Sequence, residues 1–374
     1  MKTNPYFPEI HGLLGFGAMR LPMQGKEIDL ETTKKMVDRF IESGFNYFDT
    51  AHGYHSEKSE TALRACLTSC YPRESYILTD KLTRDYFETE EDIRPFFEKQ
   101  LKLCGVDYFD FYLMHAQGRG NYDHFRKCRA YETAFELKKE GKIRHVGLSF
   151  HDTADVLEQI LKDYPQVDVV QIQYNYLDYE NLGVQSRKLR DVCRKYDKPI
   201  LVMEPVKGGQ LAKLPEQALE PFKKLGDASP ASYAMRFAAG AEGVCCVLSG
   251  MSSMEQMEDN IRTMLDPQPL SGPETEAAEE TTRIMHSLKL IDCTSCHYCT
   301  DSCPVGIRIP EIFSCRNTQE TMEGWNGVFA YNNFFTGPGT KASDCIACGQ
   351  CEEACPQHLP VIKLLAQIAE EYEK

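Results

Sequence analysis

The chain has 374 residues and a formal net charge of −14 at pH 7, a length that exceeds one average domain and fits one large domain with a smaller one. The negative charge disfavours nucleic acid and anionic membranes as partners, because both recruit clustered Lys and Arg. No apolar run approaches the roughly 18 residues of a membrane-spanning helix and the N-terminus lacks the apolar core of a signal peptide, so we expect a reducing, cytoplasmic location.

Short apolar runs alternate with amphipathic segments between residues 13 and 265. Runs rich in Val, Ile, Phe and Tyr, each followed by a helical pattern, predict parallel strands that close into a (β/α)8 TIM barrel, an α/β fold. An open, doubly wound sheet is the alternative, but residues 15–17 lack the third glycine of its usual phosphate-binding turn. The predicted strands are Leu13–Gly17, Asn46–Asp49, Tyr76–Lys81, Phe109–Met114, His145–Ser149, Val169–Gln173, Pro199–Met203 and Val244–Leu248.

Four polar residues stand at the ends of three consecutive predicted strands. Asp49 ends the first of these strands, and Tyr54 follows it on a glycine-containing turn. Lys81 ends the second strand and His115 follows the third. Because a barrel delivers the carboxyl ends of all its strands to one rim, we expect the four side chains to converge there.

Such a group of side chains can deliver a proton to a carbonyl oxygen. A phenol has an ordinary pKa of about 10, and a neighbouring ammonium favours the phenolate and brings proton donation within range. Asp49 would hold Lys81 charged, and His115 would position the carbonyl beside Tyr54. The set resembles the Asp, Tyr, Lys, His tetrad of the aldo-keto reductase family, with all positions filled in the expected order.

The resemblance also implies a nicotinamide cofactor, NAD(P)(H). Two strand-end residues match the family positions that bind the carboxamide, and the segment 248–260 resembles the loop and helix start that hold the adenosine phosphate. That segment contains no Lys or Arg for a 2′-phosphate, which weakens NADPH relative to NADH and leaves both open. The implied residues are Ser149 and Gln171 for the carboxamide, and Gly250, Ser252, Gln256 and Asn260 for the phosphate.

The density of cysteines changes towards the C-terminus. Nine of the 16 cysteines lie between Cys293 and the end of the chain, and the preceding residues 267–273 read Pro-Gln-Pro-Leu-Ser-Gly-Pro. This composition is typical of a linker. We therefore predict a reductase barrel at residues 1–266 and a smaller, mainly helical domain at residues 267–374.

The pattern C-x2-C-x2-C-x3-C-P occurs twice in this second domain. In ferredoxins with two clusters, three cysteines of one run bind one cluster and the fourth binds the other. The resemblance to bacterial-type two-cluster ferredoxins implies two 4Fe-4S clusters; zinc is the alternative, although it usually takes separated cysteine pairs. The expected ligand sets are Cys293, Cys296, Cys299 and Cys355 for one cluster, and Cys345, Cys348, Cys351 and Cys303 for the other.

Together the two domains predict an oxidoreductase that transfers hydride between a nicotinamide and a small aldehyde, ketone or alcohol. A 4Fe-4S cluster moves one electron and a nicotinamide moves two, so exchange between them needs a relay such as a flavin, for which the sequence shows no signature. Three interpretations stay open. The clusters conduct electrons to a one-electron partner protein, they only support the structure, or the chain is a non-catalytic redox sensor or electron carrier on a reductase-like barrel.

Overall fold

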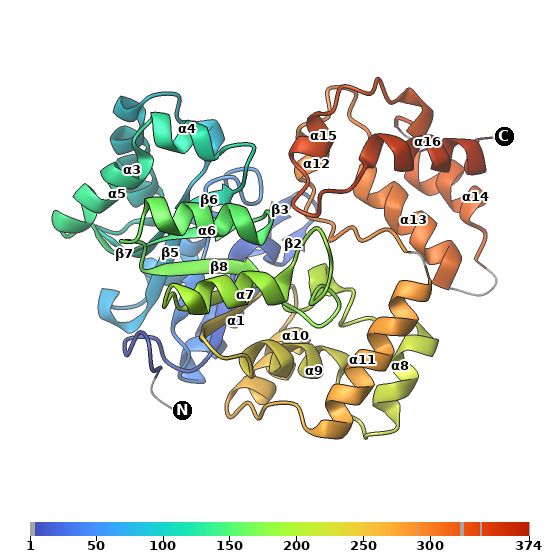
Figure 1. Cartoon of the computed structure of the whole chain (residues 1–374), viewed down its shortest axis with the longest axis horizontal. Helices are drawn as coiled ribbons and strands as arrows, with labels where there is room; N and C mark the ends of the chain where they lie inside the picture. The colour runs from blue at the N-terminus through green and yellow to red at the C-terminus, as the bar shows by residue number, and fades with distance from the viewer. Residues whose placement is uncertain (1–3, 289, 322–324, 337–338, 374) are drawn as a thin grey trace. The chain divides into compact units, whose positions relative to one another are not determined.

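The computed structural model describes residues 4–288, 290–321, 325–336 and 339–373, and its secondary structure is shown in Figure 1. The chain divides into two compact units. The first comprises the chain up to Pro205 together with Ala231–Leu270, and the second comprises Val206–Pro230 together with the chain from Ser271 onward. The outermost residues of the two predicted domains, 1–3 and 374, lie outside the described residues, and the domain boundary at 266/267 stays a prediction.

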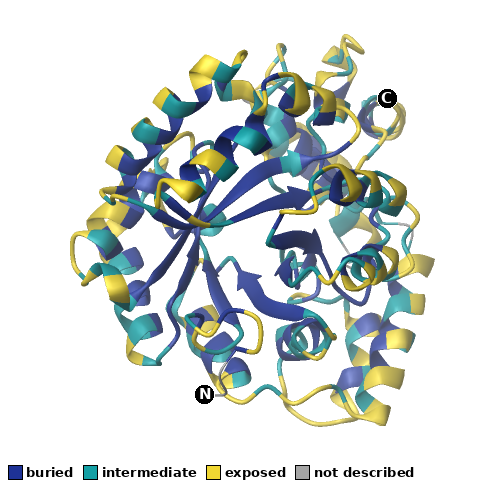
Figure 2. Ribbon diagram, turned by 60° about the vertical axis from the view of Figure 1, so that its left-hand side comes forward, coloured by how far each residue is buried: buried dark blue, intermediate teal, exposed yellow. Residues whose placement is uncertain are grey.

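Eight parallel strands close into a barrel in the first unit, in the order β1-β10-β9-β8-β7-β6-β5-β4. The predicted (β/α)8 barrel is therefore confirmed, and the open sheet is wrong. The strands are almost wholly buried (Figure 2), which explains why they read as continuous apolar runs. They are β1 (Leu14–Gly17), β4 (Tyr47–Asp49), β5 (Ile77–Leu82), β6 (Phe109–Gln117), β7 (Ile143–Phe150), β8 (Val169–Gln173), β9 (Ile200–Met203) and β10 (Val244–Ser249).

The parallel register carries the predicted site residues to one rim. Asp49 on β4 pairs with Thr79 on β5, and Ser149 on β7 pairs with Gln171 on β8. β6 extends past its predicted end, so His115 lies within the strand and not after it. The other predicted strands agree with the observed ones to within two residues at either end.

Helices surround the barrel and turn their exposed faces outward (Figure 2). At the start of α3 the side chains of Thr89 and Asp92 form a capping box, and at its end Gly105 takes the left-handed conformation with φ 70°. The helices of this part of the chain are α1 (Leu30–Glu42), α2 (Ser59–Leu63), α3 (Glu90–Cys104), α4 (Tyr122–Lys127), α5 (Ala130–Lys139), α6 (Ala154–Asp163), α7 (Ser186–Lys195), α9 (Pro230–Ala239) and α10 (Met254–Met264).

Two local features of the first unit differ from the sequence patterns. The helical segment after Tyr54 begins at Ser59 with α2 and continues as a π-helical turn over Arg64–Thr68, a distortion that the sequence patterns did not predict. A short antiparallel hairpin, β2 (Met23–Gln24) with β3 (Glu27–Ile28), has no counterpart among the predicted strands. Short 3-10 turns also lie at Ala18–Arg20, Arg73–Ser75 and Arg84–Tyr86.

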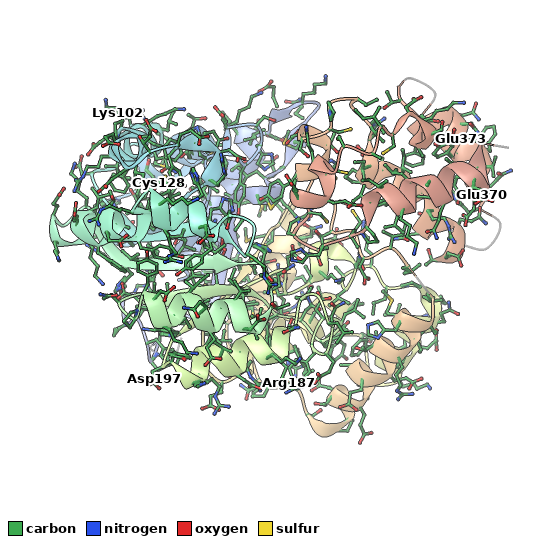
Figure 3. All side chains as sticks on the ribbon, turned by 45° about the horizontal axis from the view of Figure 1, so that its top comes forward. Lys102, Cys128, Arg187, Asp197, Glu370 and Glu373 are labelled. Carbon is green, nitrogen blue, oxygen red and sulfur yellow. The ribbon has the colours of Figure 1, made fainter. Side chains whose placement is uncertain are left out.

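The second unit is helical and has an apolar core of its own, which includes Ile309, Phe313, Tyr331 and Leu365. The Tyr331 hydroxyl donates to the carboxylate of Glu373, which is labelled in Figure 3. The helices are α8 (Glu216–Lys223), α11 (Gly272–Ser287), α12 (Tyr298–Asp301), α13 (Ile309–Thr321), α14 (Gly327–Ala330), α15 (Gln350–Glu353) and α16 (Val361–Tyr372), with 3-10 turns at Lys207–Gly209 and Ala342–Asp344 and a π turn at Tyr331–Phe335.

Residues 206–230 belong to this second unit. The Thr281 hydroxyl donates to the carbonyl oxygen of Ala218 over 2.9 Å, and Gln210 Nε2 donates to the carbonyl oxygen of Cys293 over 2.8 Å. Gly208 lies so close to Thr294 that a Cβ atom would stand 2.5 Å from its carbonyl oxygen. Within the described residues, no helix combines the length and apolar character that crossing a membrane requires.

Candidate active site

Lys81 and Asp49 form a buried ion pair at the carboxyl ends of β5 and β4. Lys81 Nζ lies 2.7 Å from Asp49 Oδ1, and the two residues are 0% and 4% exposed. The same ammonium donates to the carbonyl oxygen of Thr50 over 2.7 Å and to the hydroxyl of Tyr54 over 3.2 Å. Since an ammonium has three donors, these three acceptors engage all of them and fix the phenol oxygen beside the cation.

Gln171 completes the surroundings of Asp49. Its Nε2 donates to Asp49 Oδ2 over 3.2 Å, so each carboxylate oxygen accepts a hydrogen bond. Ser149 lies on the neighbouring strand, where its hydroxyl oxygen accepts from the N–H of Ala116 over 2.8 Å. The structure thus brings both expected carboxamide ligands to the rim of the tetrad, and their role towards a nicotinamide stays a prediction.

His115 lies next to Tyr54 and is largely buried. The two rings meet edge to face, with 6.0 Å between centroids and an interplanar angle of 77°. Burial lowers the pKa of His115 well below its ordinary value, and the nearby charges of Lys81 and His151 act in the same direction. The ring is therefore neutral near pH 7, and its Nδ1 lies 2.6 Å from the hydroxyl oxygen of Thr83.

The four expected phosphate-binding residues gather at the start of α10. The N–H of Ser252 donates to Gln256 Oε1 over 2.7 Å, and Asn260 Nδ2 donates to Ser249 Oγ over 2.9 Å. Gly250 begins the loop that leads into the helix, and Ser253 caps the helix by accepting from the N–H of Gln256. These bonds shape the loop, and phosphate binding by it stays a prediction.

Arg20, which is distant in sequence, also contacts this loop, and the sequence patterns did not predict that contact. Its carbonyl oxygen accepts from the Ser252 hydroxyl over 2.9 Å, and its side-chain carbons would lie 3.1 Å from a Cβ atom at Gly250. Burial, and then the charge of Arg20, lower the pKa of His55 on the Tyr54 turn. A cationic residue therefore lies beside the expected phosphate loop, although residues 248–260 contain no Lys or Arg.

The eight repeated cysteines of the second unit line two separate cavities. One cavity has apolar walls that include Ile309 and Phe313, and the other has walls that include Ile307 and Leu365. The four cysteines of each cavity are those that the repeat assigned to one cluster, so the fourth cysteine of each run stands with the other run. The sets are Cys293, Cys296, Cys299 and Cys355, and Cys303, Cys345, Cys348 and Cys351.

The backbone repeats along with the cysteines. In the first run Ser295 and His297 have φ 51° and 67°, and the matching Ala347 and Gly349 of the second run have φ 56° and 85°. Left-handed turns of this kind arrange successive N–H groups around an anionic centre, as at many Fe–S sites. Burial, and then the neighbouring Cys296, raise the pKa of the Cys299 thiol, so a bound cation is what would hold it as a thiolate.

Two family models match the chain, the Aldo/keto reductase family over residues 13–272 and a 4Fe-4S dicluster domain over residues 292–360. An uncharacterized oxidoreductase of Schizosaccharomyces pombe is 29% identical over 260 residues, which cover 67% of this chain and 80% of that protein. The L-galactose dehydrogenase of Arabidopsis thaliana is 25% identical over 299 residues, which cover 74% and 91%.

Solved structures share the barrel. An aldo-keto reductase from Klebsiella pneumoniae in complex with NADPH superposes with a TM-score of 0.58 at 20% identity, covering 71% of this chain and 89% of that one. The match of one family model to well over half of the sequence decides the family. The chain belongs to the aldo/keto reductase family and carries a 4Fe-4S dicluster domain on its C-terminal side.

Proposed function

We propose that the protein transfers hydride reversibly between NAD(P)(H) and a small aldehyde, ketone or alcohol at the barrel rim. The observation that carries this proposal is the hydrogen bond from the buried Lys81 ammonium to the Tyr54 hydroxyl. A bound nicotinamide would supply or accept the hydride. Membership of the family supports the reaction class, and the NADPH complex of the K. pneumoniae structure supports the class of cofactor.

Tyr54 is the proton donor in this proposal. Its oxygen already accepts from Lys81, so its own O–H can be directed to the oxygen of a carbonyl substrate. When that proton leaves, the phenolate stays beside a cation in a buried site, where the cation stabilises it more strongly than it could in bulk solvent. Asp49 keeps the ammonium in place throughout.

His115 holds the same carbonyl oxygen from a second direction. The hydroxyl of Thr83 can donate to its Nδ1, which places the ring proton on Nε2. A neutral ring can then donate from Nε2 to the substrate without adding a charge to the site. Two donors on one oxygen polarise the carbonyl and orient its carbon.

Replacement of Tyr54 by Phe tests the assignment of the proton donor. Tyr54→Phe should lower the rate of carbonyl reduction by at least about a hundredfold, the scale of losing a general acid. Nucleotide affinity should change little, because the ring and its packing remain. Steady-state kinetics with a panel of small aldehydes and ketones measures the rate, with Tyr6→Phe, a change at an exposed tyrosine, as the control. Unchanged rates in Tyr54→Phe would contradict the assignment.

Arg20 alters the expectation for the nucleotide. The loop 248–260 offers an anion the N–H groups at the start of α10, and Arg20 adds the cation that the loop lacks. A guanidinium suits either the pyrophosphate, which both nucleotides carry, or the 2′-phosphate of NADPH. NADH and NADPH are therefore both proposed as cofactors, with affinities within about tenfold of each other, or about 1.4 kcal/mol.

Arg20→Gln separates these two roles of the arginine. Loss of a charged hydrogen bond worth about 1.5–3 kcal/mol should weaken binding by roughly tenfold to a hundredfold. Equal losses for NADH and NADPH would place Arg20 at the pyrophosphate, and a loss confined to NADPH would place it at the 2′-phosphate. Equilibrium titration measures both, with Arg262→Gln on the exposed side of α10 as the control. Unchanged affinity for both nucleotides would remove Arg20 from the site.

The two cysteine sets are proposed to bind one 4Fe-4S cluster each. Bound clusters would carry single electrons. Cys348 is exposed and its neighbour Ile346 is 64% exposed, so the set that includes Cys348 opens to the surface of its unit. This exposure favours the interpretation in which the clusters serve a one-electron partner protein over purely structural support. Thiolate ligands of this kind also suit the reducing cytoplasm expected from the sequence.

Cys303 tests whether the clusters are ligated across the two runs. The wild type prepared without oxygen should contain about eight irons and eight labile sulfides per chain, and Cys303→Ala should lose the cluster held by Cys345, Cys348 and Cys351. Iron and sulfide analysis with low-temperature paramagnetic resonance measures both, and Cys70→Ala, at an exposed cysteine outside both sets, should keep all eight irons. Loss of the Cys293 cluster alone would show that each run binds its own.

A further inference from the structure

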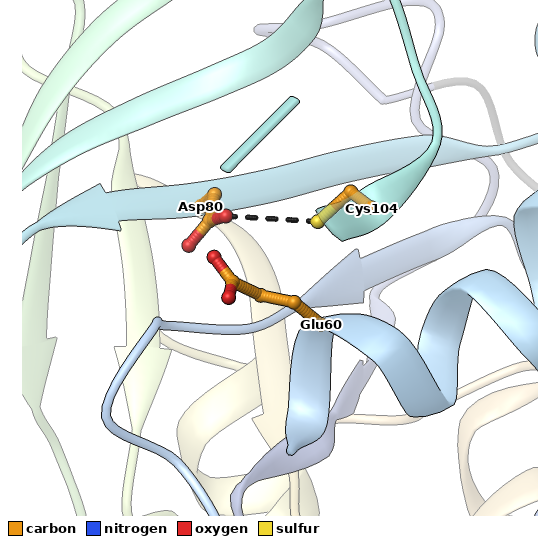
Figure 4. Close-up of side chains that lie close together, drawn as sticks. All are labelled: Glu60, Asp80 and Cys104. Atoms are coloured by element: carbon orange, nitrogen blue, oxygen red, sulfur yellow. Dashed lines mark hydrogen bonds between the residues drawn. The ribbon is translucent and has the colours of Figure 1, made fainter. Parts of the chain in front are cut away.

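A second group of buried polar side chains lies beside the tetrad and takes no part in it. Glu60 on α2, Asp80 on β5 and Cys104 at the end of α3 are all fully buried, and one oxygen or sulfur atom of each lies within 4.8 Å of the others. Figure 4 shows the two carboxyl groups pointing at each other. Asp80 directly precedes Lys81, and because successive strand residues face opposite sides, the group lies behind the strand that carries Lys81.

Glu60 is tied to the turn that carries Tyr54. Its Oε2 lies 2.5 Å from Nδ1 of His52, a buried residue two positions before Tyr54. His52 Nε2 lies 3.0 Å from Lys99 Nζ. An ammonium can only donate, so Nε2 accepts and the ring proton resides on Nδ1. A neutral His52 thus donates to Glu60, consistent with burial, and then Lys99, lowering its pKa.

Asp80 precedes Lys81 on β5, and its side chain hydrogen bonds to the Lys81 backbone. Its Oδ1 accepts from the backbone N–H of Lys81 over 2.8 Å, and its other oxygen, Oδ2, accepts from the Cys104 thiol over 3.7 Å. The carbonyl oxygen of Lys81 accepts from Gln100 Nε2 over 3.0 Å, and Gln100 Oε1 accepts from the Tyr112 hydroxyl. Side chains therefore hydrogen bond to both backbone groups of Lys81: Asp80 accepts from its N–H, and Gln100 donates to its C=O.

The two carboxyl groups lie close together, with one oxygen of each within 4.8 Å of the other, and both are fully buried. Two ionised carboxylates would repel each other at this separation, because each only accepts hydrogen bonds. Glu60 Oε1 has no hydrogen-bond partner among the described groups, which suits a pair that holds a proton of its own. Burial raises the pKa of Glu60 to about 7, and burial, followed by Glu60, raises the pKa of Asp80 well above its ordinary value.

The charges around the pair do not neutralise it directly. Lys99 on α3 and Glu57 on the Tyr54 turn both contact His52, which in turn contacts Glu60. His52 Nε2 lies 3.0 Å from Lys99 Nζ and 3.6 Å from Glu57 Oε2. The ammonium of Lys81 is engaged by Asp49 and Tyr54 at the rim. The remaining titratable neighbours, Cys104, Tyr86 and Tyr112, have pKa values raised by burial and stay neutral.

We infer that Glu60 and Asp80 share one proton and act as a positioning pair that locks the Tyr54 turn to the Lys81 strand. One carboxyl holds the turn through His52 and the other holds the Lys81 backbone, so the shared proton joins the two halves of the proton-donating site. The turn needs such an anchor, because His55, Ser56 and Glu57 are consecutive non-glycine residues in the left-handed region, with φ 52°, 53° and 66°. The catalytic part of this inference rests on the proposed function.

The pair predicts a definite dependence of stability on pH. A carboxyl whose pKa is raised in the folded state contributes stability that is complete below its unfolded value, 4.5 for Glu60, and is lost as the pH rises through about 7. Within that window the wild type should lose up to about tenfold in its folding equilibrium constant per pH unit, because the folded state holds one proton more than the unfolded state. As the pH rises through about 7 Glu60 loses its proton, the hold of the pair on the Tyr54 turn weakens, and the rate constant kcat should fall.

Glu60→Gln is the direct test, performed on the whole cluster-containing protein. The amide can accept from His52 and donate to Asp80 without a titrating proton. Denaturant unfolding between pH 4.5 and 8 should show that the variant lacks the loss seen in the wild type, and its kcat should no longer fall above pH 7. Glu60→Ala should lower kcat at every pH, and Glu74→Gln, at an exposed carboxylate, should follow the wild type in both measurements.

The stability measurement keeps this inference separate from the proposed function, since it requires no substrate. Parallel stability curves for the wild type and Glu60→Gln would overturn the shared proton, even in an active enzyme. A stoichiometric divalent cation other than iron, found in the wild type and absent from Glu60→Gln, would also overturn the shared proton. A changed stability curve with an unchanged pH profile of kcat would overturn the positioning role. Asp80→Asn provides a second route, since its amide can donate to an ionised Glu60 and should also abolish the pH-dependent loss.

Discussion

The buried ion pair between Lys81 and Asp49 is the interaction on which the rest of the barrel rim depends. Both charges are buried, so each is stable only while the other stays within hydrogen-bonding distance, 2.7 Å in this structure. The parallel register of β4 and β5 is what brings them together. Tyr54 then has one place beside the ammonium, Gln171 completes Asp49, and His115 closes the third side of the group.

The barrel and the tetrad could be predicted from sequence because their signals are local. Strands that are buried on both faces appear as continuous apolar runs, and residues such as Lys81 and His115 stand near the ends of those runs. Arg20 gave no such signal, because its contact with Ser252 joins residues 232 positions apart. Glu60 and Asp80 looked like an ordinary helix residue and an ordinary strand residue, and only packing shows that their carboxyl groups meet.

The second unit shows the same distinction. The two cysteine runs predicted the grouping seen around the two cavities, because a short repeat dictates a short repeated backbone path, down to the left-handed residues at matching positions. The association of residues 206–230 with this unit had no sequence signal, since it depends on the close approach of Gly208 to Thr294 and on α8 beside α11. Structure set by neighbouring residues could thus be predicted from the sequence, and contacts between distant segments could not.

We propose that the barrel rim carries out hydride transfer and that Tyr54 supplies the proton. The most direct measurement is a single turnover of the complete protein with a nicotinamide deuterated at its transferable position and a small aldehyde, analysed by mass spectrometry or NMR. We expect the wild type to form an alcohol with deuterium on the former carbonyl carbon, and Tyr54→Phe to form much less of it. Tight nucleotide binding without transfer of the label to any of a panel of aldehydes and ketones would contradict this proposal.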